Sequence, residues 1–137
     1  MSIQEVKGQS EGVGEVWKEI PYNNNNREGL YVGTFKNNKL QGDGVVYYDR
    51  EKTKIMFKGY FKDDMFEGYG EYYDEDENII HLGIYNNMGI LKEGEWWRNG
   101  RLYVGTLDNN TYLLQGEGEI YYDREKTKIM FKGYFKD

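Results

Sequence analysis

Seventeen residues of this chain occur twice without a single change, at 47–63 and at 121–137, with the sequence YYDREKTKIMFKGYFKD. An identical internal copy of this length indicates a protein built from repeats. A looser pattern surrounds the copy: an aromatic-x-Gly-x-aromatic element is followed, after a turn, by a Gly-x-Gly element. Units of between twenty and thirty residues are typical of arrays in which each unit buries its apolar face only against its neighbours.

A single unit has the pattern of a β-hairpin. Tyr31, Gly33 and Phe35 alternate with other residues, which is the period of a β-strand. Residues 36–39, KNNK, carry turn chemistry because asparagine tolerates the left-handed backbone conformation. The charged segment 49–54 is too short for a useful helix, so we expect it to return the chain to a further strand. The repeats together predict an antiparallel meander.

Glycines recur inside these predicted strands, where glycine usually marks a close approach by another group. We expect an aromatic ring from the next strand to lie flat across each glycine and stabilise the sheet. Alternation places the rings on one face, as a ladder of Tyr31, Phe35, Phe57, Phe61, Tyr85, Tyr103, Phe131 and Phe135. The repeat glycines are Gly33, Gly42, Gly44, Gly59, Gly68, Gly70, Gly83, Gly94, Gly105, Gly116, Gly118 and Gly133.

The composition favours a thin sheet over a thick globular core. Only 38% of residues are hydrophobic and the mean hydropathy is -0.91, yet 17% are aromatic. Aromatic rings bury a large area while tyrosine keeps its hydroxyl in water. The chain has no cysteine, so disulfides and cysteine-based zinc sites are excluded. We expect disorder only at the ends and in the loops.

Charge and hydropathy also limit the cellular compartment and the classes of partner that the sequence predicts. The formal net charge of -6 would repel nucleic acid and, on average, anionic lipid, so we expect no nucleic-acid partner. No stretch approaches the roughly 20 apolar residues of a membrane helix, and the N-terminus has neither a basic leader nor an apolar run. We therefore expect a cytoplasmic protein.

The segments YVGTFKNNKLQGDGVVYY and FKGYFKDDMFEGYGEYY resemble MORN repeats, whose usual form is Tyr-x-Gly-x-Trp/Phe, a short turn, and Gly-x-Gly-x-x-x-Tyr. One unit departs from that form, with Lys92 in place of the first glycine of the pair. The resemblance implies an all-β, elongated, single-layer antiparallel meander of β-hairpin repeats, and a role in cytoskeletal, ciliary or membrane-junction assemblies. The chain would form one array, with a half repeat at 8–30, repeats at 31–56, 57–80, 81–102 and 103–130, and a half repeat at 131–137.

The chain offers little for catalysis, and we predict a non-enzymatic protein without a cofactor. His81 is the only histidine, and no nucleophile with a neighbouring base is evident. It occupies the first aromatic position of a repeat, which favours a packing role. Residues 74–78, DEDEN, resemble the start of a calcium loop, but Ile79 and Tyr85 stand where that loop needs glycine and glutamate. We expect a solvated acidic turn there and no metal site.

Three features are candidates for binding. Trp96 and Trp97 are adjacent, so one would join the ladder and the other would face solvent or a partner, with local packing as the alternative. A basic set could bind lipid headgroups, although a solvated strand face is the favoured interpretation: Lys52, Lys54, Lys58, Lys62, Lys126, Lys128, Lys132 and Lys136. The half repeat at 131–137 would leave a strand edge that pairs with a partner, with a second copy, or with a continuation of the chain.

The sequence thus predicts a scaffold or structural subunit that assembles with other proteins, in a cytoskeletal or ciliary complex. The alternative is a membrane-associating module that binds anionic headgroups through the basic set.

Overall fold

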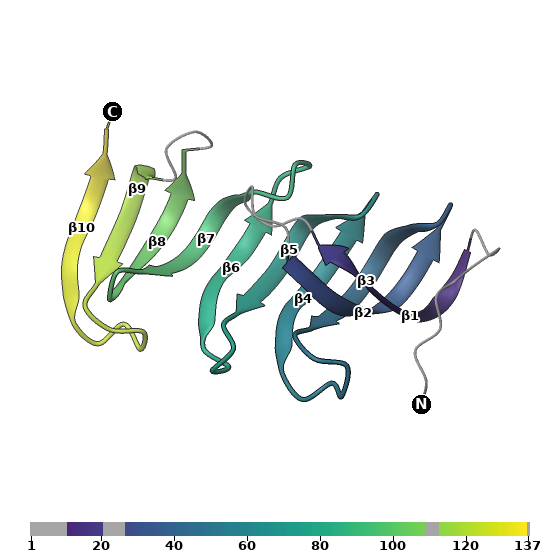
Figure 1. The fold of residues 1–137 in the computed structure, drawn as a ribbon. Coiled ribbons are helices and arrows are strands. Elements are labelled where there is room, and N and C mark those ends of the chain that lie inside the picture. Colours follow the sequence, from purple (N-terminus) through teal and green to yellow (C-terminus); the bar gives the residue numbers. More distant parts are fainter. Residues whose placement is uncertain (1–10, 21–26, 109–112, 137) are drawn as a thin grey trace.

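The computed structural model describes residues 11–20, 27–108 and 113–136. Parts of three predicted units therefore lie outside the described residues: 8–10 and 21–26 of the first half repeat, 109–112 of the repeat at 103–130, and Asp137 of the last half repeat. The described residues form ten strands and no helix: β1 (Glu11–Ile20), β2 (Arg27–Lys36), β3 (Lys39–Tyr47), β4 (Ile55–Lys62), β5 (Met65–Tyr73), β6 (Ile79–Tyr85), β7 (Leu91–Arg98), β8 (Arg101–Leu107), β9 (Leu114–Tyr121) and β10 (Ile129–Phe135). They form one antiparallel sheet whose spatial order is the chain order (Figure 1), which confirms the predicted all-β elongated meander.

Two kinds of connection link the strands. Three are two-residue turns in which both central residues have positive φ, at Asn37–Asn38, Asp63–Asp64 and Asn99–Gly100. This turn type matches the twist of the flanking strands, and asparagine, aspartate and glycine tolerate it best. Four longer loops, at 48–54, 74–78, 86–90 and 122–128, are each closed by an aspartate or asparagine side chain. In the first copy of the duplicated segment, the amides of Thr53 and Lys54 donate to the Asp49 carboxylate, and the Asp123 loop repeats this arrangement.

A line of glycines crosses the whole sheet. Each of the ten strands contributes one glycine, and these glycines are direct partners in every neighbouring pair of strands. The line consists of Gly14, Gly33, Gly44, Gly59, Gly70, Gly83, Gly94, Gly105, Gly118 and Gly133.

Aromatic rings occupy the space that side chains would need at several of these positions, whereas at Gly83 and Gly94 the backbone of the partner strand occupies it. A Cβ at Gly44 would lie 2.4 Å from Cε2 of Tyr31, and a Cβ at Gly70 would lie 2.4 Å from Cζ of Phe57. The ring of Tyr31 also covers Gly33 of its own strand, because a Cβ there would lie 2.5 Å from the hydroxyl oxygen. One ring therefore covers two neighbouring strands, whereas the sequence analysis expected cover from the next strand alone.

The first glycine of most Gly-x-Gly elements has a different role, which is to adopt a backbone conformation with positive φ. Gly42, Gly68 and Gly116 have φ of 94°, 75° and 74°, and each lies where the strand register shifts. Nothing lies within 4 Å of the Cβ position of Gly68, so the backbone conformation alone selects glycine there. Lys92 lies at the corresponding place in β7. Its φ is not positive, so this position does not need glycine, which explains why the repeat pattern has lysine here.

The rings and aliphatic side chains on one face form the core, which we call the aromatic face. Tyr31, Phe57, Phe61 and Phe66 are fully buried there. The rings of Phe57 and Phe66 stack at a centroid distance of 3.6 Å, and those of Tyr31 and Phe61 meet edge to face at 5.0 Å. Such ring pairs add about 0.5–1.5 kcal/mol beyond their area burial.

The hairpin of β1 and β2 covers part of the aromatic face. Its far end bends back over the sheet (Figure 1), so that Ile20 is fully buried and the Lys18 ammonium lies 2.9 Å from the Asp64 carboxylate at the β4–β5 turn. Gly29 permits this bend, since a Cβ there would lie 2.7 Å from Cγ1 of Val46. Residues 18–20 and 27–30 thus belong to β1 and β2.

The duplicated segment shows how much burial depends on neighbours. Phe57 of β4 is 0% exposed, whereas its copy Phe131 in β10 is 44% exposed. In the described chain β10 pairs only with β9, while β4 lies between β3 and β5. Of the predicted ladder, Tyr31, Phe35, Phe57, Phe61 and Tyr85 are buried, Tyr103 and Phe135 are half-buried against the core, and Phe131 is exposed for this reason.

The two glycine tasks predict different responses to substitution. Gly70→Ala should destabilise the fold by about 2–3 kcal/mol through its clash with Phe57, and Gly68→Ala by about 1–2 kcal/mol through backbone strain. The cost of Gly70→Ala should fall in a Phe57→Leu background, whereas Gly68→Asn should recover much of the Gly68→Ala loss. Urea unfolding of these variants measures both effects, and equal costs of Gly70→Ala in the two backgrounds would contradict the steric explanation.

Candidate protein-interaction surface

The face opposite the aromatic rings, which we call the outer face, carries two rows of side chains beside the glycine line. The first row lies on one side of the glycine line. Because neighbouring strands are antiparallel, its residues precede the line glycine in β2, β4, β6, β8 and β10 and follow it in β3, β5, β7 and β9: Val32, Val45, Lys58, Glu71, Leu82, Glu95, Val104, Glu119 and Lys132. The other row comprises Asp43, Tyr60, Tyr69, Ile84, Glu93, Thr106, Glu117 and Tyr134. Strand alternation places both rows on one surface.

The outer face exposes aromatic rings. Tyr60 is 40% exposed, Tyr69 53% and Tyr134 70%. The hydroxyl of Tyr69 donates to Glu71 over 3.0 Å, and the same carboxylate accepts from Tyr73 over 2.5 Å. Burial, followed by the bond to Glu71, raises the pKa of Tyr73 to about 12, so this hydroxyl keeps its proton.

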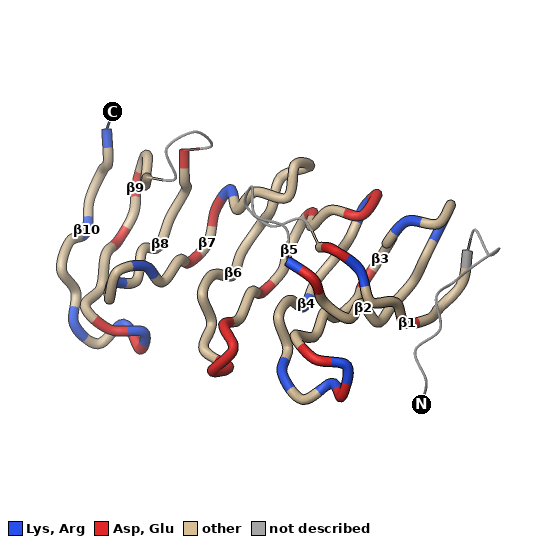
Figure 2. The backbone as a smooth tube through the Cα atoms, viewed as in Figure 1, with Lys and Arg blue, Asp and Glu red and all other residues tan. Residues whose placement is uncertain are grey.

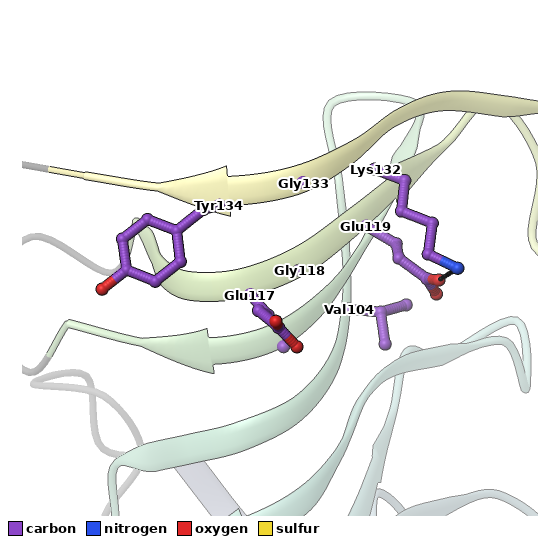
Figure 3. A pocket seen from close by; sticks show the side chains of 8 residues that line it. Val104, Glu117, Gly118, Glu119, Lys132, Gly133 and Tyr134 are labelled. Carbon is purple, nitrogen blue, oxygen red and sulfur yellow. Dashed lines mark ion pairs between the residues drawn. The ribbon is translucent and has the colours of Figure 1, made fainter.

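Two shallow hollows lie on this face. The first is floored by Gly44 and Gly59 and bordered by Val32, Asp43, Val45, Lys58, Tyr60, Tyr69 and Glu71. The second is floored by Gly105, Gly118 and Gly133 and bordered by Val104, Glu117, Glu119, Lys132 and Tyr134, from β8, β9 and β10 (Figure 3). These tyrosines and hollows were not among the sites that the sequence analysis named.

The charged loop of the duplicated segment folds against the outer face at its edge. The guanidinium of Arg50 lies 4.5 Å from the ring centroid of Trp17, and Lys52 pairs with Glu15. The second copy repeats both contacts: Arg124 lies 4.1 Å from Trp97, and Lys126 pairs with Glu95 at 2.7 Å. We call each set of four residues a clasp. The recurrence of Glu-x-Trp and Arg-x-Lys in the sequence was a signal that could have revealed it.

The clasps decide where the two candidate tryptophans lie. Trp97 belongs to the second clasp, on the outer face beneath Arg124. Trp96 lies on the aromatic face, half-buried against the core, with His81 as its direct partner in β6. Leu102, which pairs with Trp97, is also buried, although it lies outside the main core cluster.

The structure places the predicted basic residues in two separate groups, one in each copy of the duplicated segment, and pairs some of them with acids. Lys52 and Lys126 are held in the clasps, and Lys132 lies 3.7 Å from Glu119. The other members are exposed and lie in two groups that are six strands apart (Figure 2), one on β4 and the loop before it, the other on the loop before β10 and directly after β10: Lys54, Lys58, Lys62, Lys128 and Lys136.

His81 lies in the aromatic packing. It is 5% exposed, its ring stacks on Tyr72 at 5.1 Å, and Nδ1 contacts the Tyr85 hydroxyl. The Asp74 carboxylate accepts hydrogen bonds from the amides of Asp76 and Asn78, which closes the acidic turn. Within the described residues, no group of three or more histidine, aspartate or glutamate side chains could hold a metal ion.

No model of a known protein family matches this chain, and a search of the curated proteins finds no match to it. The structure, over the residues that it describes, has no helix of the length and apolarity needed to cross a membrane.

The clasps predict unequal effects of the same substitution. Lys52→Met leaves the carboxylate of Glu15, which is only 7% exposed, without its partner and should destabilise the fold by about 2 kcal/mol. Lys126→Met affects the 26% exposed Glu95 and should cost less than about 1 kcal/mol. Urea unfolding compares the two variants, and adding Glu15→Gln to Lys52→Met should restore part of the loss. Equal costs for the two lysines would show that burial of Glu15 has no influence.

His81 predicts a pH dependence of stability. Burial lowers its pKa from 6.5 to about 3, so the unfolded chain binds a proton in this range that the folded chain does not. Stability should therefore fall as the pH falls below 6.5 toward 3, by about 2 kcal/mol between pH 7 and pH 5. Urea unfolding at both pH values should show this loss, and His81→Phe should remove it. A loss of the same size in His81→Phe would assign the effect to other groups.

Proposed function

We propose that this protein is a non-enzymatic scaffold or structural subunit that assembles with other proteins through the outer face of its sheet. The observation that carries the proposal is the set of exposed rings there, Tyr60, Tyr69 and Tyr134. Tyrosine is enriched at protein interfaces because a rigid ring provides contact area at a low entropic cost, together with a hydroxyl.

The architecture supports this role. The sheet uses one face for its core, where aromatic rings cover the glycine line at Gly33, Gly44 and Gly70. The outer face is thus held on a rigid support and presents its side chains at strand spacing, which is about 4.8 Å. The resemblance of the repeats to MORN repeats also favours a scaffold, in the cytoplasm and in a cytoskeletal or ciliary assembly.

The alternative is a membrane-associating module that uses the exposed lysines. The ion pairs of Lys52, Lys126 and Lys132 leave fewer lysine charges for headgroups, and the two rows of the outer face from β3 to β10 carry six carboxylates and two lysines. Vesicles with anionic headgroups should therefore fail to sediment the protein at physiological salt. Salt-sensitive co-sedimentation would favour the membrane module over the scaffold.

The test of the scaffold is a cross-linked pull-down of the tagged protein from its native cells, followed by mass spectrometry. We expect a set of partner proteins in fixed ratio, and we expect Tyr60→Ser/Tyr134→Ser to lose them while its melting temperature stays within a few degrees. Met88→Ser is the matched control, because Met88 is 65% exposed on a loop outside the outer face. Recovery of the same partners by the double tyrosine variant would contradict the proposal.

A further inference from the structure

The two hollows of the outer face occupy corresponding places in the repeats. Both combine a valine of one strand, a carboxylate and a glycine of the next strand, and a Lys-Gly-Tyr segment of the third strand. The corresponding pairs are Val32 and Val104, Asp43 and Glu117, Gly44 and Gly118, Lys58 and Lys132, Gly59 and Gly133, and Tyr60 and Tyr134. A similar set of side chains is therefore presented on β2–β4 and on β8–β10, although the first hollow has Val45 where the second has Glu119.

A carboxylate and a tyrosine occupy directly opposite positions on neighbouring strands in each hollow. Asp43 and Tyr60 are direct cross-strand partners, and so are Glu117 and Tyr134. All four residues are exposed. A carboxylate beside an aromatic face suits a cation, which gains a charge-assisted hydrogen bond from one group and a cation–π contact from the other.

The lysine of each hollow does not cancel this preference. Lys132 lies 3.7 Å from Glu119, and Lys58 is directly opposite Glu71. Each hollow therefore has one carboxylate in excess, at Asp43 and at Glu117. From β3 to β10 the two rows of the outer face carry Asp43, Glu71, Glu93, Glu95, Glu117 and Glu119 against Lys58 and Lys132. The clasps add Arg50, Lys52, Arg124 and Lys126 at the edge of this face, so the attraction for a basic partner is local to the two excess carboxylates.

We propose that the two hollows are equivalent sites for arginine side chains of a basic segment in a partner protein. Arginine fits better than lysine, because its planar guanidinium pairs with a carboxylate and also stacks on a ring. The inference rests on the proposed scaffold function and specifies its partner. Corresponding strands of the two sites are six places apart in the sheet, which is a separation of about 29 Å at the usual strand spacing.

This separation makes the sites suitable for bivalent binding. A flexible linker of about 30 glycine and serine residues has an average span of about 30 Å, which matches the distance between the sites. Two basic segments joined by such a linker should bind about 100-fold more tightly than one segment, without any new contact. A partner with two basic segments would thus be selected over a partner with one.

The first experiment is a titration of the isotope-labelled full chain with an eight-residue peptide of alternating arginine and glycine, followed by NMR at physiological salt. We expect the amide signals of Asp43, Tyr60, Glu117 and Tyr134 to shift. Asp43→Asn/Glu117→Gln should weaken binding about tenfold, because each site loses the carboxylate that pairs with the guanidinium and orients it. Glu51→Gln/Glu125→Gln removes the same charge from exposed loop positions and should change the affinity less than about twofold.

The second experiment uses two copies of the peptide joined by the 30-residue linker. Glu117→Gln alone should abolish the gain in affinity of the linked peptide while leaving the single peptide on the Asp43 site. An equal loss in the loop control and in the site variant would overturn the inference, because binding would then follow net charge alone. Absence of peptide binding, or binding that a glutamine-for-arginine peptide reproduces, would overturn it as well.

The pull-down separates this inference from the scaffold proposal. If Asp43→Asn/Glu117→Gln retains the partners that the tyrosine variant loses, the arginine sites are wrong and the scaffold stands. If the peptides bind as expected but no protein is recovered from cells, the scaffold fails and the arginine sites stand.

Discussion

The sheet depends on the contact between an aromatic ring and a strand position without a Cβ. Tyr31 covers Gly33 and Gly44, and Phe57 covers Gly70, at distances where a side-chain carbon could not remain. Each ring thereby connects two strands through packing as well as through the backbone ladder. A chain with so few aliphatic residues can stabilise an extended sheet in this way, because an aromatic ring that lies flat on the sheet buries a large apolar area.

This contact also determines which surface is left for function. The rings require one face of the sheet, and the β1–β2 hairpin closes part of it through Ile20 and the ion pair of Lys18 with Asp64. The opposite face keeps its tyrosines and carboxylates exposed over a row of glycines. The clasps of Trp17 and Trp97 cover only the edge of that face, where the duplicated loop folds back onto the strand two places earlier.

The sequence predicted the fold well, because periodicity and turn chemistry are local. The alternation around Gly33 and the turn at 36–39 predicted the hairpins, and the meander followed. The long-range features could not be predicted in this way. The bend at Gly29 depends on Val46, and the exposure of Phe131 depends on strand pairing, since the identical Phe57 is buried. The tyrosines of the hollows were overlooked because alternation alone does not distinguish an outer ring from a core ring.

The most direct test of the ring contact is the proton NMR spectrum of the glycines. A proton beneath an aromatic ring is shifted upfield by the ring current, so one Hα of Gly44 and one of Gly70 should lie well upfield of ordinary glycine values. Gly68, with nothing within 4 Å of its Cβ position, should show an ordinary shift and serves as the internal reference. Loss of the upfield shift of Gly70 in Phe57→Leu would show that the ring of Phe57 causes it. Ordinary Hα shifts at both Gly44 and Gly70 would contradict the account.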